Sequence, residues 1–223
     1  MNTLAVIVLV VAKAPEPGKA KTRLAKTVGE RAAAEIAAAA LLDTLDAVAE
    51  MPVAARVVAL TGDVDAACAA AEIRRRLGAF TVIGQRGDDF ADRLANAHAD
   101  AGKVAAGLPV LQIGMDTPQV TAELLTRCAR TLLDAEAVLG QACDGGWWIL
   151  GLRDPAAAEC LRGVPMSQSN TGELTAQALR DNGIDVVAVE PLADVDVIDD
   201  IGGVRNACLP SSRFAQITRQ AGV

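Results

Sequence analysis

Four of the five lysines of the chain lie within one stretch of fourteen residues: Lys13, Lys19, Lys21 and Lys26. Arg23 lies in the same stretch and Glu16 is its single acidic residue, so five positive charges and one negative give +4 in a chain of net charge −7. Such a local excess of positive charge attracts anions. Pro15, Pro17 and Gly18 favour a stiff, turned backbone. The stretch therefore predicts an anion-binding loop.

The alternative is a solvated basic loop that only improves solubility. The loop directly follows the apolar run Leu4–Ala12, and doubly wound α/β folds bind phosphates in that place, which favours the anion site. Two common phosphate loops are absent, because the chain has no G-x-G-x-x-G motif and Gly18-Lys19-Ala20-Lys21-Thr22 lacks the spacing of G-x-x-x-x-G-K-[ST]. A dinucleotide dehydrogenase and a P-loop NTPase are therefore both disfavoured.

Two acidic positions are candidates for a metal site. Asp116 follows an apolar run in Ile113-Gly-Met-Asp-Thr-Pro118. It could cap the next helix, but Thr121 is better placed to do so. A carboxylate that faces a polyphosphate is repelled unless a divalent cation lies between them, so we predict that Asp116 binds Mg²⁺ or Mn²⁺. In the acidic run Asp194–Asp200, Asp196 is the predicted second ligand, whereas Asp199 and Asp200 could cap a helix.

Asp144-Gly145-Gly146 is a further candidate, because two glycines let the backbone approach a ligand beside a carboxylate. A tight turn between two strands explains the glycines equally well. His98 is the only histidine and lies within a predicted helix, so a surface or core position is favoured over catalysis, and a Ser-His-Asp triad has little support.

The pattern of apolar runs predicts the elements that position these residues. Five strand-like runs alternate with Ala-rich helical stretches, at Leu4–Ala12, Arg56–Leu60, Phe80–Ile83, Pro109–Ile113 and Ala137–Gln141. Later in the chain, a helix is predicted from about Thr171 to Asp181, and it leads to a strand at Ile184–Val189. This alternation is typical of βαβ units in an α/β fold with a mostly parallel sheet and helices on both faces. We expect every strand to end at the same edge, where the polar loops converge on a ligand site. Without a linker or a repeat, residues 1–223 are predicted to form one domain.

Composition excludes several classes. Aromatic residues make up only 2% of the chain and the net charge is negative, which argues against nucleic acid as a partner. The apolar run at the N-terminus is too short to cross a bilayer, where about 20 residues are needed, and the residues before it lack the positive charge of a signal peptide. We expect a cytoplasmic protein without membrane insertion. The five cysteines form no C-x-x-C pair, so neither disulfides nor a zinc site are predicted.

Several motifs together resemble a known family. They are Lys13-Ala-Pro-Glu-Pro-Gly-Lys-Ala-Lys-Thr-Arg-Leu24, Gln85 to Arg93, Ile113–Pro118, Asp144–Leu152 and Asp194-Val-Asp196. The chain resembles the rSAM/selenodomain-associated transferases, also called arsenosugar-biosynthesis-type glycosyltransferases, over nearly its whole length. These proteins have the GT-A fold of nucleotide-diphospho-sugar transferases. Met115, Thr117 and the pair Trp147-Trp148 depart from the usual pattern, which bears on the acceptor more than on the fold.

The resemblance implies roles for particular residues. Lys21 and Arg23 would grip the nucleotide phosphates and act in catalysis, Gln85 and Arg93 would help to bind the nucleotide, and Asp116 would take the place of the metal-binding aspartate of the GT-A fold. The residue patterns described above add further predicted positions. These are Lys13, Pro15, Gly18, Lys19, Gly145 and Gly146 for nucleotide binding, Asp144 for catalysis and Asp196 as the second metal contact. Arg86 would help to hold the ligand or to order its loop.

Two reactions and one non-catalytic role fit these residues. The leading hypothesis is transfer of a glycosyl group from a nucleotide-sugar to a small-molecule acceptor, with a metal ion and Lys/Arg side chains stabilising the departing diphosphate. The alternative is a nucleotidyltransferase in which a sugar or lactate phosphate attacks the α-phosphorus of an NTP and pyrophosphate leaves, as in phospholactate guanylyltransferases. A nucleotide-binding module without catalysis is the third hypothesis. A homo-oligomer is compatible with the sequence.

Overall fold

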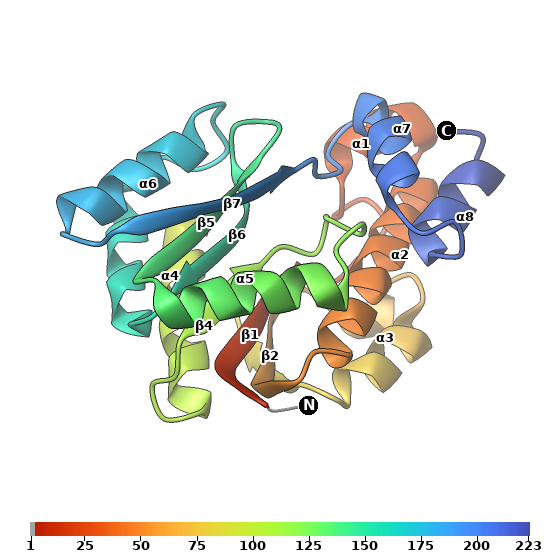
Figure 1. The fold of residues 1–223 in the computed structure, drawn as a ribbon. Coiled ribbons are helices and arrows are strands. Elements are labelled where there is room, and N and C mark those ends of the chain that lie inside the picture. The colour runs from red at the N-terminus through yellow and green to blue at the C-terminus, as the bar shows by residue number, and fades with distance from the viewer. Residues whose placement is uncertain (1–2) are drawn as a thin grey trace.

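Seven strands form one sheet in the order β3-β2-β1-β4-β6-β5-β7 (Figure 1). The structure is a computed structural model that describes residues 3–223, so Met1 and Asn2 of the predicted domain lie outside the described residues. The strands are β1 (Leu4–Lys13), β2 (Val53–Thr61), β3 (Thr81–Gly84), β4 (Val110–Ile113), β5 (Ala137–Ala142), β6 (Trp147–Leu152) and β7 (Val186–Leu192).

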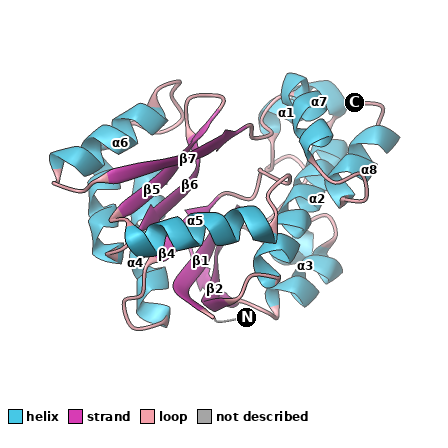
Figure 2. Ribbon diagram, in the orientation of Figure 1, coloured by secondary structure: helices cyan, strands magenta, loops and turns pink. Residues whose placement is uncertain are grey.

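Helices cover both faces of this sheet (Figure 2). They are α1 (Thr22–Val28), α2 (Glu30–Ala49), α3 (Ala70–Leu77), α4 (Phe90–Val104), α5 (Ala122–Asp134), α6 (Thr171–Asp181), α7 (Ile198–Ala207) and α8 (Arg213–Gln220), with 3₁₀ segments η1 (Val64–Ala66) and η2 (Pro155–Gly163). Side chains of a strand alternate between the two faces, and a strand that is apolar throughout must therefore be covered on both. In β1, Val6, Val8 and Val10 pack with α2, α3 and α5. Ile7, Leu9 and Val11 pack with α4, α6 and η2 on the opposite face.

Strand direction agrees with the prediction except at β6. The pairs β1–β2, β1–β4, β2–β3 and β5–β7 are parallel, whereas β6 is antiparallel to both β4 and β5. The expectation that every strand ends at one edge is therefore wrong for β6. The physical reason is the short connection at residues 143–146, because a tight turn can join only antiparallel neighbours. β1, β4 and β5 still run in the same direction, so their carboxyl ends lie at one edge of the sheet.

A third apolar cluster lies outside the two sheet faces. Leu24 of α1, Ile201 of α7 and Phe214 of α8 pack on Ile36 of α2, and all four are at most 1% exposed. Figure 1 shows these helices together at the right of the molecule. This cluster packs α1, which follows the basic loop directly, against α2, the longest of the helices. Within residues 3–223, no helix is both long and apolar enough to cross a membrane.

Candidate functional site: opposite charges at the carboxyl edge of the sheet

The basic loop between β1 and α1 is held by its own single acidic residue. Glu16 is only 4% exposed, and it accepts hydrogen bonds from the backbone N–H of Asp63 (3.0 Å) and from Lys19 Nζ (2.6 Å). Lys13 Nζ donates to the backbone carbonyl of Lys19 (2.8 Å). Gly18 adopts φ +78°, where a side chain is strained. Two of the loop's lysines thus stabilise the loop itself, which leaves fewer free cations than the sequence predicts.

Lys21 is the loop residue that reaches across the site. Its Nζ lies 2.7 Å from Asp116 Oδ2, and the two side chains are 14% and 31% exposed. Lys21 precedes α1 in a left-handed conformation, φ 46° and ψ 50°. This conformation costs a non-glycine residue about 1–2 kcal/mol and is often found at functional sites. The surrounding structure therefore holds Lys21 in a strained backbone that directs its ammonium group to Asp116.

Arg23 makes the second ion pair of the site, in the first turn of α1. Its guanidinium lies 2.6 Å from Asp196 Oδ2, and it is 65% exposed while Asp196 is 34% exposed. An exposed pair of this kind stabilises the protein little, by about 0–1 kcal/mol. The pair therefore shows that Arg23 and Asp196 lie side by side, but it contributes little to the stability of the protein.

Backbone hydrogen bonds explain why the two acidic segments meet. The N–H of Val195 donates to the carbonyl of Asp116 (3.0 Å), so the segment after β7 lies against the segment after β4. Asp200 Oδ2 accepts from the N–H groups of Asp196 and Val197 at the start of α7, as a helix cap. Thr121 caps α5 through the N–H of Leu124, which agrees with the prediction that it leaves Asp116 free.

The charges of the site perturb one another. Burial acts to lower the pKa of Lys21, but the negative charges of Asp116, Asp196 and Asp194 outweigh it and raise that pKa above its ordinary value. Burial, followed by the charges of Asp116 and Asp144, raises the pKa of Asp194 to about 6. Four carboxylates and two cationic side chains therefore share one neighbourhood, with more negative than positive charge.

Asp194 is the residue of this site that sequence reasoning did not select. The sequence predicts that the acidic run supplies a metal ligand, but it indicates Asp196 for that role. The available signal is the alternation Asp194-Val195-Asp196, because Val195 is only 2% exposed. In an extended segment, the residues on either side of a buried one point to the same face.

The turn between β5 and β6 places Asp144 near the acidic segments. Asp144 Oδ1 accepts from the N–H of Gly146 (2.7 Å), and the N–H of Gly172 donates to the carbonyl of Gly145 (2.8 Å). A Cβ added to Gly145 would lie 1.8 Å from the carbonyl oxygen of Ser169. The space beside Gly145 is thus filled by the chain itself, so packing explains this glycine in the structure.

The loop after β3 carries Gln85, Arg86 and Arg93. Gln85 Nε2 donates to the carbonyls of Ala12 (2.8 Å) and Ala59 (2.9 Å), which fixes the loop to the ends of β1 and β2. Arg86 forms a two-pronged ion pair with Asp100 (2.7 and 2.9 Å). These contacts favour ordering of the loop over ligand binding for both residues. Among residues 3–223, no hydrogen bond or ion pair involves the side chain of Arg93.

Asp116 and Asp196 suit a divalent cation only in part. Carboxylate oxygens are the ligands that Mg²⁺ and Mn²⁺ prefer. In the described part of the chain, however, no three His, Cys, Asp or Glu side chains are grouped closely enough to hold a metal ion. The excess of carboxylates around Asp194 favours a cation at this place. Mg²⁺ is usually bound by one or two carboxylates with phosphate oxygens and water, so the donor set fits a metal that arrives with a nucleotide.

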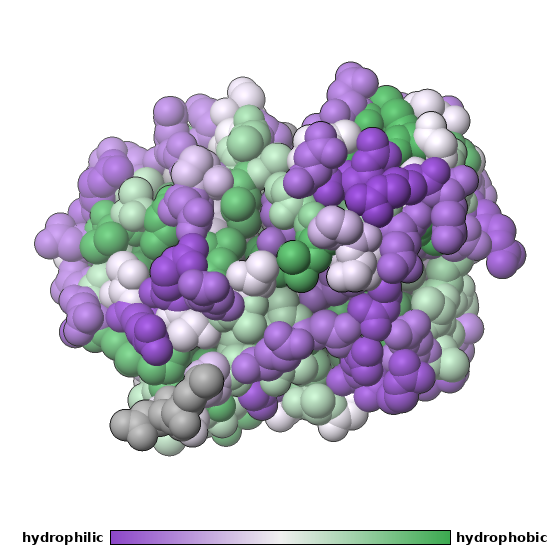
Figure 3. Space-filling model, turned by 45° about the vertical axis from the view of Figure 1, so that its right-hand side comes forward, coloured by the Kyte–Doolittle hydropathy of each residue, from purple (hydrophilic) through white to green (hydrophobic). Residues whose placement is uncertain are grey.

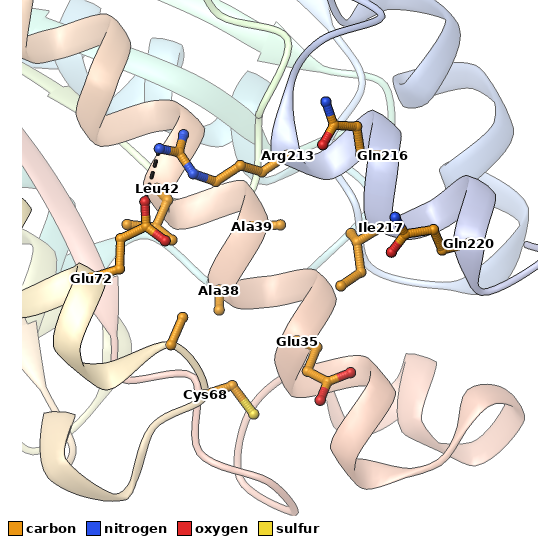
Figure 4. A pocket seen from close by; sticks show the side chains of 11 residues that line it. Glu35, Ala38, Ala39, Leu42, Cys68, Glu72, Arg213, Gln216, Ile217 and Gln220 are labelled. Atoms are coloured by element: carbon orange, nitrogen blue, oxygen red, sulfur yellow. Dashed lines mark hydrogen bonds and ion pairs between the residues drawn. The ribbon is translucent and has the colours of Figure 1, made fainter.

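Other residues with reactive side chains lie elsewhere. His98 is fully buried, its Nδ1 lies 3.2 Å from Gln112 Oε1, and burial lowers its pKa to about 4, which agrees with a core position. The five cysteines are free. A cavity of about 260 Å³ lies between α2, α3 and α8, where Arg213 contacts Glu72 (Figure 4). None of the candidate site residues lines it, so it is separate from the site.

The strand order and the helices on both faces define a class of α/β fold that solved structures share. A protein from Desulfovibrio desulfuricans G20 described as a nucleotide-diphospho-sugar transferase superimposes with a TM-score of 0.86 at 24% identity, covering 100% of this chain and 96% of its own. Rv0371c of Mycobacterium tuberculosis H37Rv, solved as a complex with manganese, gives 0.55 at 19% identity, covering 89% of this chain and 97% of its own. The predicted GT-A-like fold is confirmed.

Sequence comparison places the chain more narrowly. It belongs to the family described as "Uncharacterized protein conserved in bacteria (DUF2064)", which matches residues 44–168, more than half of the chain. It is also 31% identical over 215 residues to the phosphoenolpyruvate guanylyltransferase of Streptosporangium roseum, covering 91% of this chain and 87% of that protein. The names of these relatives agree with the predicted enzyme class, a nucleotide-dependent transferase.

Proposed function

We propose that the chain is a nucleotidyltransferase that uses an NTP, GTP foremost, and a small phosphorylated acceptor such as phosphoenolpyruvate, and that it releases pyrophosphate. The observation that carries the proposal is the meeting of Lys21 and Arg23 with Asp116 and Asp196 at the carboxyl edge of the sheet. A polyphosphate and a divalent cation complement such a set of opposite charges. The guanylyltransferase of Streptosporangium roseum, similar over nearly the whole chain, supports this choice of reaction.

In the proposed reaction, an oxygen of the acceptor's phosphate attacks the α-phosphorus of the NTP. One P–O bond forms there, the bond between the α-phosphorus and the bridging oxygen breaks, and pyrophosphate leaves with the bonding electrons. Lys21 and Arg23 exchange their carboxylate partners for phosphate oxygens and stabilise the charge of the departing pyrophosphate. Lys13 and Lys19 shape the loop, while Asp144 stays a predicted catalytic residue.

Asp116 and Asp196, together with Asp194, would hold the Mg²⁺ or Mn²⁺. The metal would neutralise part of the negative charge of the phosphates. A bound cation would also offset the repulsion from Asp116 and Asp144, which adds to burial in raising the pKa of Asp194. The manganese complex of Rv0371c supports a divalent metal in this fold.

Glycosyl transfer from a nucleotide-sugar is the second candidate. The same cations would stabilise a departing nucleoside diphosphate, and the motifs that resemble rSAM/selenodomain-associated transferases support that narrower assignment. A cytoplasmic location, the identity of the acceptor and oligomer formation stay predictions.

One experiment separates the candidates. The protein is incubated with Mn²⁺ or Mg²⁺ and each NTP, with phosphoenolpyruvate, phospholactate or a sugar phosphate, and pyrophosphate release is followed. We expect release that depends on both the acceptor and GTP. Release of a nucleoside diphosphate from a nucleotide-sugar, with no pyrophosphate from any NTP, would instead establish the second candidate.

A further inference from the structure

The chain segment after β7 is bound to the loop after β4 on both sides of Asp194. The N–H of Val195 donates to the carbonyl of Asp116 (3.0 Å), and the side-chain Nε2 of Gln119 donates to the carbonyl of Ala193. Ala193 and Val195 are the chain neighbours of Asp194, so these two hydrogen bonds fix the backbone of Asp194 against the loop that carries Asp116. Gln119 contributes the side-chain bond, which a substitution can remove.

The same segment is also bound to the turn that carries Asp144. Leu192 pairs with β5, and its carbonyl accepts from the N–H of Cys143 (3.0 Å), the residue before Asp144. The bonds on the two sides hold Asp116, Asp144 and Asp194 in one neighbourhood, where the charges of the first two act on the third. The connection to Asp144 is made by backbone alone, whereas the connection to the loop of Asp116 needs a side chain.

The amide of Gln119 is buried at a cost to stability. Gln119 is only 9% exposed, and its Oε1 has no hydrogen-bond partner within residues 3–223. Thr117 Oγ1, in the same loop, is likewise buried and unpaired in that part of the chain. A buried acceptor without a partner destabilises the folded state, and an apolar side chain of the same length would avoid that cost. Stability alone therefore does not explain a glutamine at this position, and its bond to the carbonyl of Ala193 is the contact that does.

Placement of the acidic segment matters because its carboxylates repel one another. Like charges in one neighbourhood act to push the segment away from the loop after β4, and a hydrogen bond between the two opposes this. In metal sites, the groups that hold the ligands in place commonly contribute about 10- to 100-fold in metal affinity. A side chain that fixes Asp194 beside Asp116 is therefore expected to affect binding of a cation without touching it.

We propose that Gln119 is a positioning residue for the divalent cation, and this inference rests on the proposed function. Its amide holds Ala193 against the loop after β4 and so keeps Asp194 beside Asp116 in spite of their repulsion. The cation then meets carboxylates that are already in place. Gln119 acts through Asp194 and is not itself a ligand of the cation.

The test uses Gln119→Met, which keeps the length of the side chain and removes its amide. Binding of Mn²⁺ in the presence of GTP, without acceptor, is followed by the paramagnetic resonance signal of the free ion. We expect binding to weaken about tenfold, and the Mn²⁺ concentration that gives half-maximal pyrophosphate release to rise by a similar factor. At saturating Mn²⁺, kcat should stay within about twofold of the wild type.

Two further variants sharpen the test. Gln119→Asn, whose amide is one methylene shorter, is expected to act in the same direction and takes the place of Gln119→Met if that variant does not fold. Gln216→Met is the matched control, because Gln216 Nε2 also donates to a backbone carbonyl, that of Ser211 (3.1 Å), but on α8. It should change neither Mn²⁺ binding nor turnover. The unfolding midpoint of Gln119→Met should match the wild type, since the lost hydrogen bond is offset by removal of the unpaired Oε1.

The outcomes separate the inference from the proposed function. An unchanged Mn²⁺ requirement in the Gln119 variant would overturn the positioning role and leave the proposed function standing. A fall in kcat that saturating Mn²⁺ does not restore would do the same, as would a lower unfolding midpoint with unchanged Mn²⁺ binding, because either result indicates a structural role only. Failure of the wild type to bind Mn²⁺ or to release pyrophosphate would overturn both.

Discussion

Two clusters in this molecule each combine cationic and anionic side chains, and they differ in how many hydrogen-bond donors their carboxylates have. The Arg213 cluster joins α8 to α2 and α3, with Arg213 bound to Asp43, Asp46 and Glu72. Asp43 additionally accepts from the backbone N–H groups of Arg213 (3.1 Å) and Phe214 (2.9 Å). The site cluster, defined as Lys21, Arg23, Asp116, Asp144, Asp194 and Asp196, has one ion pair for each of two carboxylates.

A raised carboxyl pKa occurs in both clusters, but its causes differ. Burial raises the pKa of Asp43, while backbone and guanidinium donors act to lower it. For Asp194, burial acts in the same direction as the charges of Asp116 and Asp144. In the first cluster, backbone and guanidinium donors thus oppose the effect of burial on the buried carboxylate, whereas in the second the neighbouring carboxylates add to that effect, which a divalent cation would offset. Figure 3 shows that the upper outline of the molecule is notched between two lobes.

The largest expected effect is loss of turnover in Asp116→Asn. This change removes a predicted metal ligand and the partner of Lys21 with little change in shape. We expect pyrophosphate release to fall roughly 100- to 1,000-fold. Asp46→Asn, in the Arg213 cluster, is the matched control and is expected to lower stability but not turnover. Unchanged metal-dependent binding and turnover in Asp116→Asn would favour the non-catalytic module.

Lys21→Met tests whether the lysine and the metal compete for Asp116. Removing the ammonium that lies 2.7 Å from Asp116 should tighten Mn²⁺ binding in the absence of nucleotide, while kcat/KM for GTP falls about 100-fold. Calorimetry and pyrophosphate release measure the two effects. Lys26→Met, an exposed change in the last turn of α1, should alter neither. Weaker Mn²⁺ binding in Lys21→Met would contradict the prediction that the lysine ammonium and the metal compete for Asp116.

Arg213→Met should affect stability alone. It leaves three carboxylates without their common partner, and because the arginine is 30% exposed we expect a loss of about 2 kcal/mol in the free energy of unfolding. Urea unfolding measures the loss. Arg219→Met on the same helix is expected to change it by less than about 0.5 kcal/mol. A fall in kcat of Arg213→Met would show that the two clusters are coupled.

The smallest effect concerns the pH dependence of Asp194. Its folded-state pKa, about 6, lies above the ordinary value of 3.8, so the folded protein binds the proton more tightly and stability falls as pH rises from about 4 to 6. In metal-free protein at pH 7, Asp194→Asn should therefore be more stable by about 1–2 kcal/mol. The gain should vanish below pH 4, as measured by urea unfolding across pH. If Asp194→Asn stayed more stable than the wild type below pH 4, the gain would come from packing and not from the charge of Asp194.

The sequence predicted most elements because their signals are local. The helix Thr171–Asp181 was predicted with the bounds that the structure shows, and the cap at Thr121 was predicted from residue type and spacing. Strand β7 was expected at Ile184–Val189 and is found at Val186–Leu192, because an edge strand tolerates Pro191 and lacks a clear apolar alternation. The antiparallel direction of β6 follows from the tight turn before it, which the two glycines indicate as well as they indicate a ligand site.

By itself, the sequence determined the α/β alternation, the basic loop and the acidic segments, since residue type and period act over a few neighbours. Only the tertiary structure decided which charges meet. The bond from Val195 to Asp116 brings together segments far apart in the chain, Glu16 occupies Lys19, and Ser169 fills the space beside Gly145. Such pairings depend on strand order and loop closure, and no local pattern of residues encodes them.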